Sequence, residues 1–307
     1  MVAEREAVMS DAQEPSVSID ADLVRRLIAA QFPDWADLPI RRVEHDGWDN
    51  RTFHLGQTMK VRLPSAAHYV EQVEKENTWL PRLAPHLPLP IPTPLAVGRP
   101  GEGYPWPWSV SGWIEGETAL QAPIADLTLF AREVANFLVA LQKINATGGP
   151  APGTHNFHRG APPSVYDGET RRALEALEGR IDTVLAKRIW EAALDSPWGG
   201  ASVWFHGDIA VGNLILNGGR LSAVIDFGTC GVGDPACDLA ITWTLFEGES
   251  RKAFRALLPL DEGTWMRGRA WTLWKALIVY AAEPGTDARL REKARQDLDQ
   301  LFADPGV

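Results

Sequence analysis

The chain contains the run His206-Gly-Asp-Ile-Ala-Val-Gly-Asn213 and, after a short intervening segment, the run Ile225-Asp-Phe-Gly228. Between them, two apolar stretches flank Asn217-Gly-Gly219, whose residues tolerate the positive φ angles of a tight turn. This pattern predicts a β-hairpin that returns the chain to its start. The side chains of the two runs are therefore expected to converge.

Three of these side chains suit the transfer of a phosphoryl group. Such a reaction needs a carboxylate that orients the attacking hydroxyl and accepts its proton, and oxygen ligands that hold Mg²⁺ on the phosphates. Asp208 is the candidate base, and Asn213 and Asp226 are the candidate metal ligands. The joint order and spacing indicate a small-molecule kinase, although either motif alone would be weak.

The two runs, with the following Gly233-Asp-Pro-Ala-Cys-Asp-Leu-Ala240, resemble the aminoglycoside phosphotransferase family of the protein-kinase-like superfamily. The resemblance covers approximately Asp20 to Leu301. It implies an α+β, two-lobed protein-kinase-like fold, with a small β-rich N-terminal lobe and a larger helical C-terminal lobe. It also implies that Asp208 is the base, that Asn213 and Asp226 bind Mg²⁺, and that ATP or GTP is the phosphoryl donor.

The same resemblance assigns supporting roles to three residues near the site. His206 is expected to be a scaffold residue that holds the catalytic loop, and a satisfied buried imidazole is the alternative. Asp234 and Asp238 are similar to structural acids of the family, which would cap a helix start or anchor the catalytic loop.

Periodicity along the chain predicts the two lobes. We expect a flexible extension over 1–17, a nucleotide-binding lobe over 18–114 and a catalytic and substrate-binding lobe over 115–307. Apolar spacing predicts helices over 18–32, 69–83, 127–141, 170–177, 184–194 and most of 238–302. Strands are expected within 40–63, the proline-rich segment 81–107 is expected to be extended with edge strands, and a hinge is expected at 115–117.

The nucleotide is expected to contact the first lobe at a loop and at a strand. Gly47-Trp-Asp-Asn-Arg51 resembles the loop that covers the nucleotide, with contacts from its backbone, Asn50 or Arg51, and a plain turn is the alternative. On the following strand, Lys60 and Arg62 share one face and compete to contact the α- and β-phosphates. Lys60 is the usual residue type, whereas the Val-Arg-Leu-Pro context of related proteins favours Arg62.

Two further contacts complete the predicted nucleotide site. The helix acid expected to pair with the cation is Glu76, and Glu74 is the solvent-facing alternative. The base is expected against the hinge, where backbone groups between Ser111 and Glu115 can form a reading edge. Trp113 is expected to pack there or to stack on the base, and nothing in the sequence distinguishes ATP from GTP.

The acceptor is expected to bind the helical lobe after the catalytic loop. The acidic candidates are Glu247 and Glu249, and the aromatic candidates are Trp265, Trp271 and Trp274. At helical spacing, tryptophans are more typical of a core than of a ligand site. The leading acceptor is an aminoglycoside or a similar antibiotic, and a choline-, amino-alcohol- or ketosamine-type substrate is the alternative.

Composition excludes other classes of function. The net charge of −10 argues against nucleic-acid binding. No run approaches the roughly 18 apolar residues of a membrane span, so a cytoplasmic protein is expected. The expected oligomeric state is a monomer or a homodimer. Cys230 and Cys237 are not expected to form a disulfide. Two other classes stay open: a catalytically silent nucleotide-binding regulator, and a metal-dependent hydrolase using His206, Asp208 and Asp226, for which His155 and His158 have no obvious partner.

Overall fold

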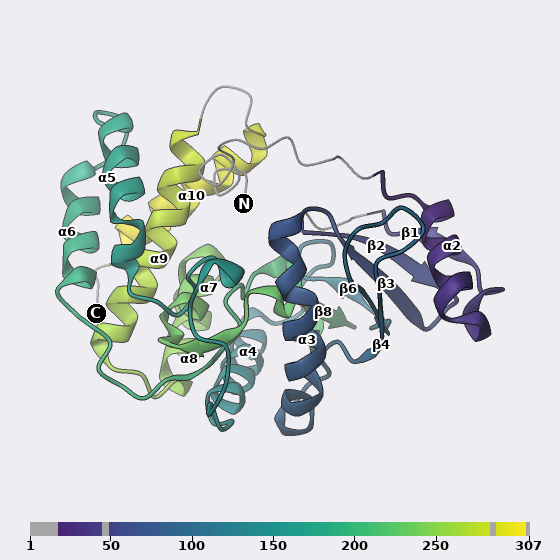
Figure 1. The fold of residues 1–307 in the computed structure, drawn as a ribbon. Coiled ribbons are helices and arrows are strands. Elements are labelled where there is room, and N and C mark those ends of the chain that lie inside the picture. The colour runs from purple at the N-terminus through teal and green to yellow at the C-terminus, as the bar shows by residue number, and fades with distance from the viewer. Residues whose placement is uncertain (1–17, 45–48, 283–286, 305–307) are drawn as a thin grey trace. The chain divides into compact units, whose positions relative to one another are not determined.

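The structure is a computed structural model that describes residues 18–44, 49–282 and 287–304 (Figure 1). The described residues form two compact units. We call residues 18–123 with 212–229 the N-terminal unit, and residues 124–211 with 230–304 the C-terminal unit. The predicted α+β class is confirmed, with an antiparallel sheet in the first unit and mostly helices in the second. The lobe boundary expected between residues 114 and 115 stays a prediction.

A five-stranded antiparallel sheet, in the order β1-β2-β3-β5-β4, forms the N-terminal unit. The strands are β1 (Ile40–Arg42), β2 (Asn50–Leu55), β3 (Met59–Pro64), β4 (Pro94–Gly98) and β5 (Trp108–Gly112). The register places Phe53 opposite Val61, and Val61 opposite Val110. One face of the three central strands is therefore apolar. β4, from the proline-rich segment, lies at an edge as expected.

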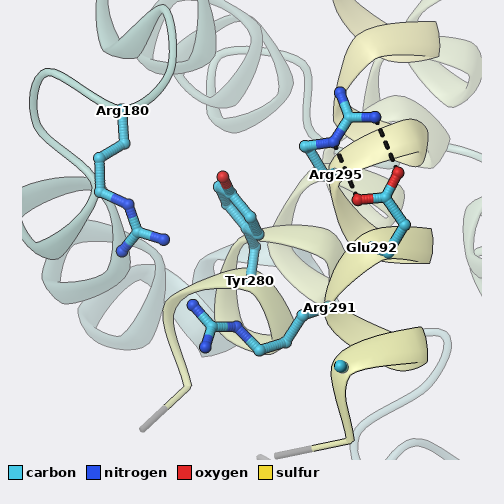
Figure 2. Close-up of a pocket in the computed structure, with 6 residues that line it drawn as sticks. Arg180, Tyr280, Arg291, Glu292 and Arg295 are labelled. Atoms are coloured by element: carbon cyan, nitrogen blue, oxygen red, sulfur yellow. Dashed lines mark hydrogen bonds and ion pairs between the residues drawn. The ribbon is translucent and has the colours of Figure 1, made fainter. Parts of the chain in front are cut away.

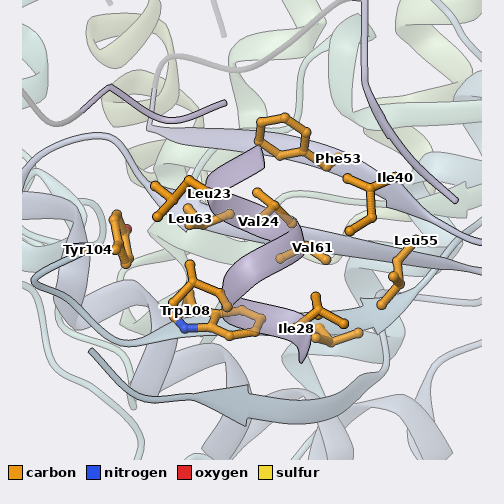
Figure 3. Packing of buried hydrophobic residues seen from close by; sticks show 12 residues of the cluster. Leu23, Val24, Ile28, Ile40, Phe53, Leu55, Val61, Leu63, Tyr104 and Trp108 are labelled. Atoms are coloured by element: carbon orange, nitrogen blue, oxygen red, sulfur yellow. The ribbon is translucent and has the colours of Figure 1, made fainter. Parts of the chain in front are cut away.

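Helix α2 (Ala21–Gln31) packs on this apolar face (Figure 3). The side chain of Asp20 caps the helix by accepting a hydrogen bond from the Leu23 N–H at 2.8 Å. Val24 and Ile28 contribute to a fully buried cluster with the sheet residues. Because side chains alternate along a strand, Lys60 and Arg62 lie on the face opposite to this core.

A hairpin and one helix complete the N-terminal unit. Strands β8 (Leu214–Asn217) and β9 (Arg220–Val224) pair with β6 (Glu117–Thr118) in the order β6-β8-β9, and α3 spans Val70–Leu83. Gly218 and Gly219 have φ angles of 59° and 77°, as the predicted tight turn requires. The predicted hairpin is confirmed.

Helices dominate the C-terminal unit. They are α4 (Leu127–Gln142), α5 (Asp167–Ala176), α6 (Thr183–Leu194), α7 (Ile241–Thr244), α8 (Gly248–Leu257), α9 (Glu262–Ala281) and α10 (Ala288–Ala303). Each predicted helical segment is confirmed, although α5 begins three residues earlier than expected, at Asp167. The strands β7 (Val203–Phe205) and β10 (Gly231–Gly233), which flank the catalytic loop and the hairpin in sequence, were not predicted.

Helix α9 is the centre of this unit. It packs against α5, α6, α10 and the short 3₁₀ helix η8 (Pro235–Ala240), so residues around most of its circumference are buried. Cys230 and Cys237 are buried, and within the described residues neither forms a disulfide. Within the described part of the chain, no helix has the length and apolar character needed to cross a membrane.

Candidate active site

In the N-terminal unit, Arg62 joins two carboxylates. Its Nη1 atom lies 3.0 Å and 2.8 Å from the two carboxylate oxygens of Glu76, and its Nη2 atom lies 3.3 Å from Oδ1 of Asp226. The Arg62 and Glu76 side chains are 12% and 9% exposed, whereas that of Asp226 is 42% exposed. The cluster is therefore closed on the side of Glu76 and open on the side of Asp226.

The charges of this cluster hold Arg62 in its ionised form. Burial alone would lower the pKa of Arg62, but the adjacent Glu76 and Asp226 carboxylates outweigh that effect and raise it. The structure thus pairs Glu76 with Arg62, which was one of the two cations predicted for this role. Glu74 is exposed, as expected for the alternative acid.

Lys60 lies on the same face but has a different environment. Burial and the neighbouring Arg62 together lower its pKa to about 8, and Glu76 and Asp226 offset this only in part. An ammonium group that is partly desolvated beside a guanidinium is poorly stabilised. Lys60 is therefore a neighbour of the Arg62 cluster rather than the partner of Glu76.

The loop that carries Asp226 is held from two directions. Asp226 itself has a φ of 66°, an uncommon value for a residue with a side chain. The Ile225 N–H donates to the Asn213 carbonyl at 2.9 Å, which joins the backbone before Asp226 to that of Asn213 at the open end of the hairpin. On the other side, the buried ammonium of Lys75 donates to the Gly228 carbonyl at 2.5 Å. Lys75 was not predicted.

The loop expected to cover the nucleotide is described only in part, because Gly47 and Trp48 lie outside the described residues. Asn50 opens β2, is buried, and lies on the same sheet face as Arg62. Arg51 lies on the opposite face, beside Phe53 in the alternation. The two residues therefore cannot both act on a ligand bound against the Arg62 face.

At the hinge, much of the predicted reading edge is already occupied by the sheet. The Gly112 N–H donates to the Thr93 carbonyl at 3.0 Å, and the Trp113 N–H donates to the Thr58 carbonyl at 2.8 Å. Ser111 is buried within β5. The Trp113 ring lies 4.1 Å from the His54 ring between centroids, which agrees with packing rather than stacking on a base. Backbone groups available for a base are thus expected beyond Trp113.

In the C-terminal unit, the catalytic loop is fixed through its main chain. The carboxylate of Asp238 accepts hydrogen bonds from the N–H groups of His206, at 2.8 Å, and Gly207, at 2.6 Å. The Nε of Arg159 donates to the Gly207 carbonyl at 3.1 Å, and the Asp208 N–H donates to Nδ1 of His206 at 3.2 Å. Burial raises the pKa of Asp238, while His206 and these N–H groups oppose the rise. The loop is therefore anchored on both sides of Gly207.

Asp208, the predicted base, has a cationic neighbour. The ammonium of Lys275, on α9, lies 3.5 Å from Oδ1 of Asp208, and both side chains are partly exposed, at 38% and 23%. A carboxylate in this position stays accessible to a hydroxyl group while one of its oxygens has a fixed partner. Neither Lys275 nor Arg159 was predicted.

Asp234 anchors α9 to η8. Its carboxylate caps η8 by accepting from the Ala236 N–H at 3.1 Å, and it receives a hydrogen bond from Nε of Arg267 at 2.6 Å. Both side chains are 2% exposed. The structure therefore gives Asp234 the helix-capping position and Asp238 the loop-anchoring position.

The predicted acceptor residues are engaged in the fold. Glu249 pairs with Lys252 at 2.8 Å on the surface, and Glu247 precedes α8 with its N–H bonded to the Ser250 hydroxyl. Trp265 packs against Phe254 and lies under Arg255. Trp271 and Trp274 are buried, and Trp274 stacks on Tyr166 with 3.9 Å between centroids. The tryptophans are core residues, as their helical spacing favoured.

A cationic hollow of about 310 Å³ occurs elsewhere in the C-terminal unit (Figure 2). Its lining residues are Arg180, Tyr280, Ala288, Arg291, Glu292 and Arg295. Arg295 pairs with Glu292 at 2.8 Å, and Arg180 lies over the Tyr280 ring. None of the predicted site residues lines this hollow.

The residues that sequence reasoning missed share one property. Lys75, Arg159 and Lys275 each bring a positive charge to a backbone carbonyl or a carboxylate of a site loop. Lys275 had a detectable signal, because it is a charged residue inside the apolar stretch 270–279 of a helix. Lys75 and Arg159 had none that spacing alone would show.

Comparison with solved structures supports the fold. The chain is similar to the GDP complex of aminoglycoside 2'-phosphotransferase-IIIa, with 16% identity, a TM-score of 0.67, and 93% of this chain and 99% of that chain covered. It is also similar to the streptomycin-ATP complex of APH(2")-IIa (18%, TM-score 0.58, 93% and 99% covered). A third similar structure is macrolide 2'-phosphotransferase MphH from Brachybacterium faecium (23%, TM-score 0.59, 91% and 98% covered).

Sequence comparison gives the family. None of the curated proteins compared with this chain matches it. The model of the phosphotransferase enzyme family matches residues 40–277, which include Arg62, Glu76, the catalytic loop and the hairpin. This kinase-type chain therefore belongs to the phosphotransferase enzyme family.

Proposed function

We propose that the chain transfers the terminal phosphoryl group of ATP or GTP to a hydroxyl of an antibiotic of the aminoglycoside or macrolide type. The observation that carries the proposal is the Arg62 guanidinium, which is fixed by Glu76 and faces a second, exposed carboxylate at Asp226. The similar structures bind GDP, ATP, ADP or aminoglycosides, or are macrolide phosphotransferases. A nucleoside triphosphate donor also suits a cytoplasmic enzyme.

Arg62 would bind the phosphates of the donor. A guanidinium presents a planar array of donors that suits phosphate oxygens, and its pairing with Glu76 holds this array in one orientation. Lys60, two residues earlier on the same face, adds positive charge toward the hinge end of β3. The polar face of the sheet is thus suited to a polyanion, whereas its other face is filled by the core.

Asn213 and Asp226 fit a Mg²⁺ site. Mg²⁺ prefers oxygen ligands and is usually bound through one or two protein groups together with phosphate oxygens and water. The hairpin supplies one amide and one carboxylate at its open end, and the carboxylate is exposed. Among the described residues, no group of three or more His, Cys, Asp or Glu side chains is placed to hold a metal ion. Bound Mg²⁺ would neutralise charge on the phosphates.

Asp208 would act as the base that orients the acceptor hydroxyl and takes its proton. The hydrogen bonds of Asp238 and Arg159 to the adjacent main chain fix the backbone from which this carboxylate extends. Fixing a base in a reactive geometry removes an entropic cost from the transition state. The acceptor oxygen would then form a bond to the terminal phosphorus while the bond to the leaving nucleoside diphosphate breaks.

The experiment that tests this proposal measures Mg²⁺-dependent turnover of ATP and GTP with aminoglycosides, macrolides and amino alcohols. We expect phosphorylation of an aminoglycoside or a macrolide, and a loss of at least about a hundredfold in kcat in Asp208→Ala. Turnover with amino alcohols alone would favour a metabolic kinase. Nucleotide binding without turnover on any acceptor would favour a regulator.

A further inference from the structure

We infer that Lys275 is a positioning residue that holds the carboxylate of Asp208 in one orientation and keeps it ionised for the acceptor hydroxyl. The inference rests on the role proposed for Asp208. It names a residue from α9, far in sequence from the two motifs that define the site.

The contact between Lys275 and Asp208 reaches the Oδ1 atom of the carboxylate. The Lys275 ammonium lies 3.5 Å from Oδ1 of Asp208, at the edge of hydrogen-bonding distance. With Oδ1 directed toward Lys275, the orientation of the Asp208 carboxylate is restricted. The pair remains partly exposed, so it can contribute to orientation without being sealed from an incoming acceptor.

The helix that presents Lys275 is fixed to the scaffold of the catalytic loop. Two turns before Lys275, Arg267 forms the buried ion pair with Asp234 of the segment that leads into η8. Gly268 approaches η8 so closely that an added Cβ would lie 2.7 Å from Cβ of Leu239. η8 also contains Asp238, which anchors the main chain of the loop. The packing of α9 on η8 thus helps to position both the backbone and the side chain of Asp208.

The charged groups around Lys275 and Asp208 are consistent with an ion pair between these two residues. On its own loop, Asp208 has the His206 ring as a neighbour, and Asp238 of η8 and Arg159 contact the adjoining main chain. Lys275 also faces Asp297 of α10, whose charged form it favours. Asp297 has its own partner in Lys293, one turn away on the same helix. Lys275 is therefore the ammonium group directed at the carboxylate of Asp208 from α9.

The chemical consequence concerns the proton of the acceptor. In the proposed reaction this proton passes to Asp208 as the acceptor oxygen bonds to phosphorus, and it leaves later to solvent. Lys275 keeps its own protons throughout. By stabilising the ionised carboxylate, it extends the active range of the base to lower pH.

The test compares Lys275→Met, Lys275→Arg and the control Lys252→Met, which removes an equal charge from an exposed ion pair on α8. In Lys275→Met we expect kcat to fall by about ten- to a hundredfold, with little change in the KM for nucleotide. The acid limb of the pH profile should move upward by about one pH unit, which is the Coulomb effect expected at this distance in a water-like medium. Lys275→Arg should restore most of both values, and Lys252→Met should resemble the wild type.

A second measurement does not depend on turnover. Titration of the Asp208 carboxyl carbon by ¹³C NMR should show its pKa about one unit higher in Lys275→Met than in the wild type. An unchanged titration with an unchanged pH profile would overturn the inference and leave the proposed function intact. If no acceptor is phosphorylated but the titration shifts, the charge coupling stands and the proposed function fails. If neither is seen, both fail.

Discussion

Two arginine–carboxylate clusters of this chain have similar ion pairs but differ in what surrounds them. In the C-terminal unit, Arg267 and Asp234 are sealed, and the remaining groups around them are capping and core contacts. In the N-terminal unit, Arg62 is sealed only toward Glu76, while Asp226 on its other side is exposed. A fully buried ion pair is part of the packing, whereas a cluster with an exposed carboxylate can still interact with a charged ligand.

This difference separates charges that stabilise the fold from charges that can bind a ligand or take part in catalysis. Breaking a buried pair leaves a desolvated charge and destabilises a fold strongly. A cluster with an exposed member loses less when it is broken, because water and neighbouring charges compensate. The predictions below test this contrast, in order of decreasing effect.

The largest effect is expected for Arg62→Met on activity. We expect kcat/KM to fall by about a thousandfold, or ~4 kcal/mol, because the phosphate-binding guanidinium is lost. Lys60 on the same face still offsets the charge of Glu76, so the loss in unfolding free energy should be smaller than for Arg267→Met. Steady-state kinetics and denaturant unfolding measure the two quantities. Wild-type activity in Arg62→Met would refute the assignment of this arginine.

Arg267→Met should show the opposite profile. It leaves Asp234 buried without its cation, and the free energy of unfolding should fall by about 3 kcal/mol. Burial already raises the pKa of Asp234 and Arg267 opposes that rise, so removing Arg267 raises it further. Because the ionised form is then disfavoured in the folded state, the deficit should grow as pH rises through this pKa and shrink toward pH 4. Urea unfolding at several pH values checks the sign.

Glu76→Gln should weaken the open cluster without removing its cation. Arg62 keeps Asp226 as a partner but loses its bidentate contact, so its guanidinium is less firmly oriented. We expect kcat/KM to fall by about thirtyfold, or ~2 kcal/mol. Glu74→Gln is the matched control. Glu74 lies two residues before Glu76 on the same helix and is exposed, so this substitution should leave kcat/KM unchanged.

Lys60→Met should have a smaller, pH-dependent effect on stability. The pKa of Lys60 is lowered from about 10.5 to about 8 in the folded protein, so the folded state binds its proton less tightly than the unfolded state does. The stability of the wild type should therefore rise with pH between about 8 and 10.5. Replacing Lys60 should flatten this rise and add about 1 kcal/mol at pH 7. A wild-type curve that is flat over this window would contradict the assigned environment.

The smallest effect is expected for Glu249→Gln. This carboxylate pairs with Lys252 on the surface, where solvent screens the pair and it contributes little to stability. We expect unchanged kinetics with any acceptor and no resolvable change in unfolding free energy. A rise in the KM for an amine-bearing acceptor would instead restore Glu249 as an acceptor residue.

Much of the fold could be predicted because its signals are local. The Asn217-Gly-Gly219 turn fixes the hairpin, and apolar spacing fixes α2, α4 and α6. β7 and β10 escaped prediction because each is three residues long and pairs across a large sequence separation, where no periodicity can develop. Element ends also escaped, as at Asp167, since the first turn of α5 carries no apolar signal.

For the candidate site, the motif residues and the supporting residues Glu76, His206, Asp234 and Asp238 could be named from the sequence, whereas the supporting cations could not. Asp208, Asn213 and Asp226 stand in recognisable order, whereas Lys75, Arg159 and Lys275 are recognised only through the atoms they contact. The choice between Lys60 and Arg62 needed the structure as well, because strand alternation gives both the same face and only the position of Glu76 separates them.

The buried bond from Lys75 to the Gly228 carbonyl has a consequence for inhibitor design. The neighbouring Gln72 lies so close that an added Cβ on Gly228 would meet its Oε1 atom at 2.8 Å, so this turn has little space into which it can swing. We expect compounds that require an outward-flipped Asp-Phe-Gly segment to bind poorly, because they must break that bond. Compounds that accept the segment as it stands avoid this cost.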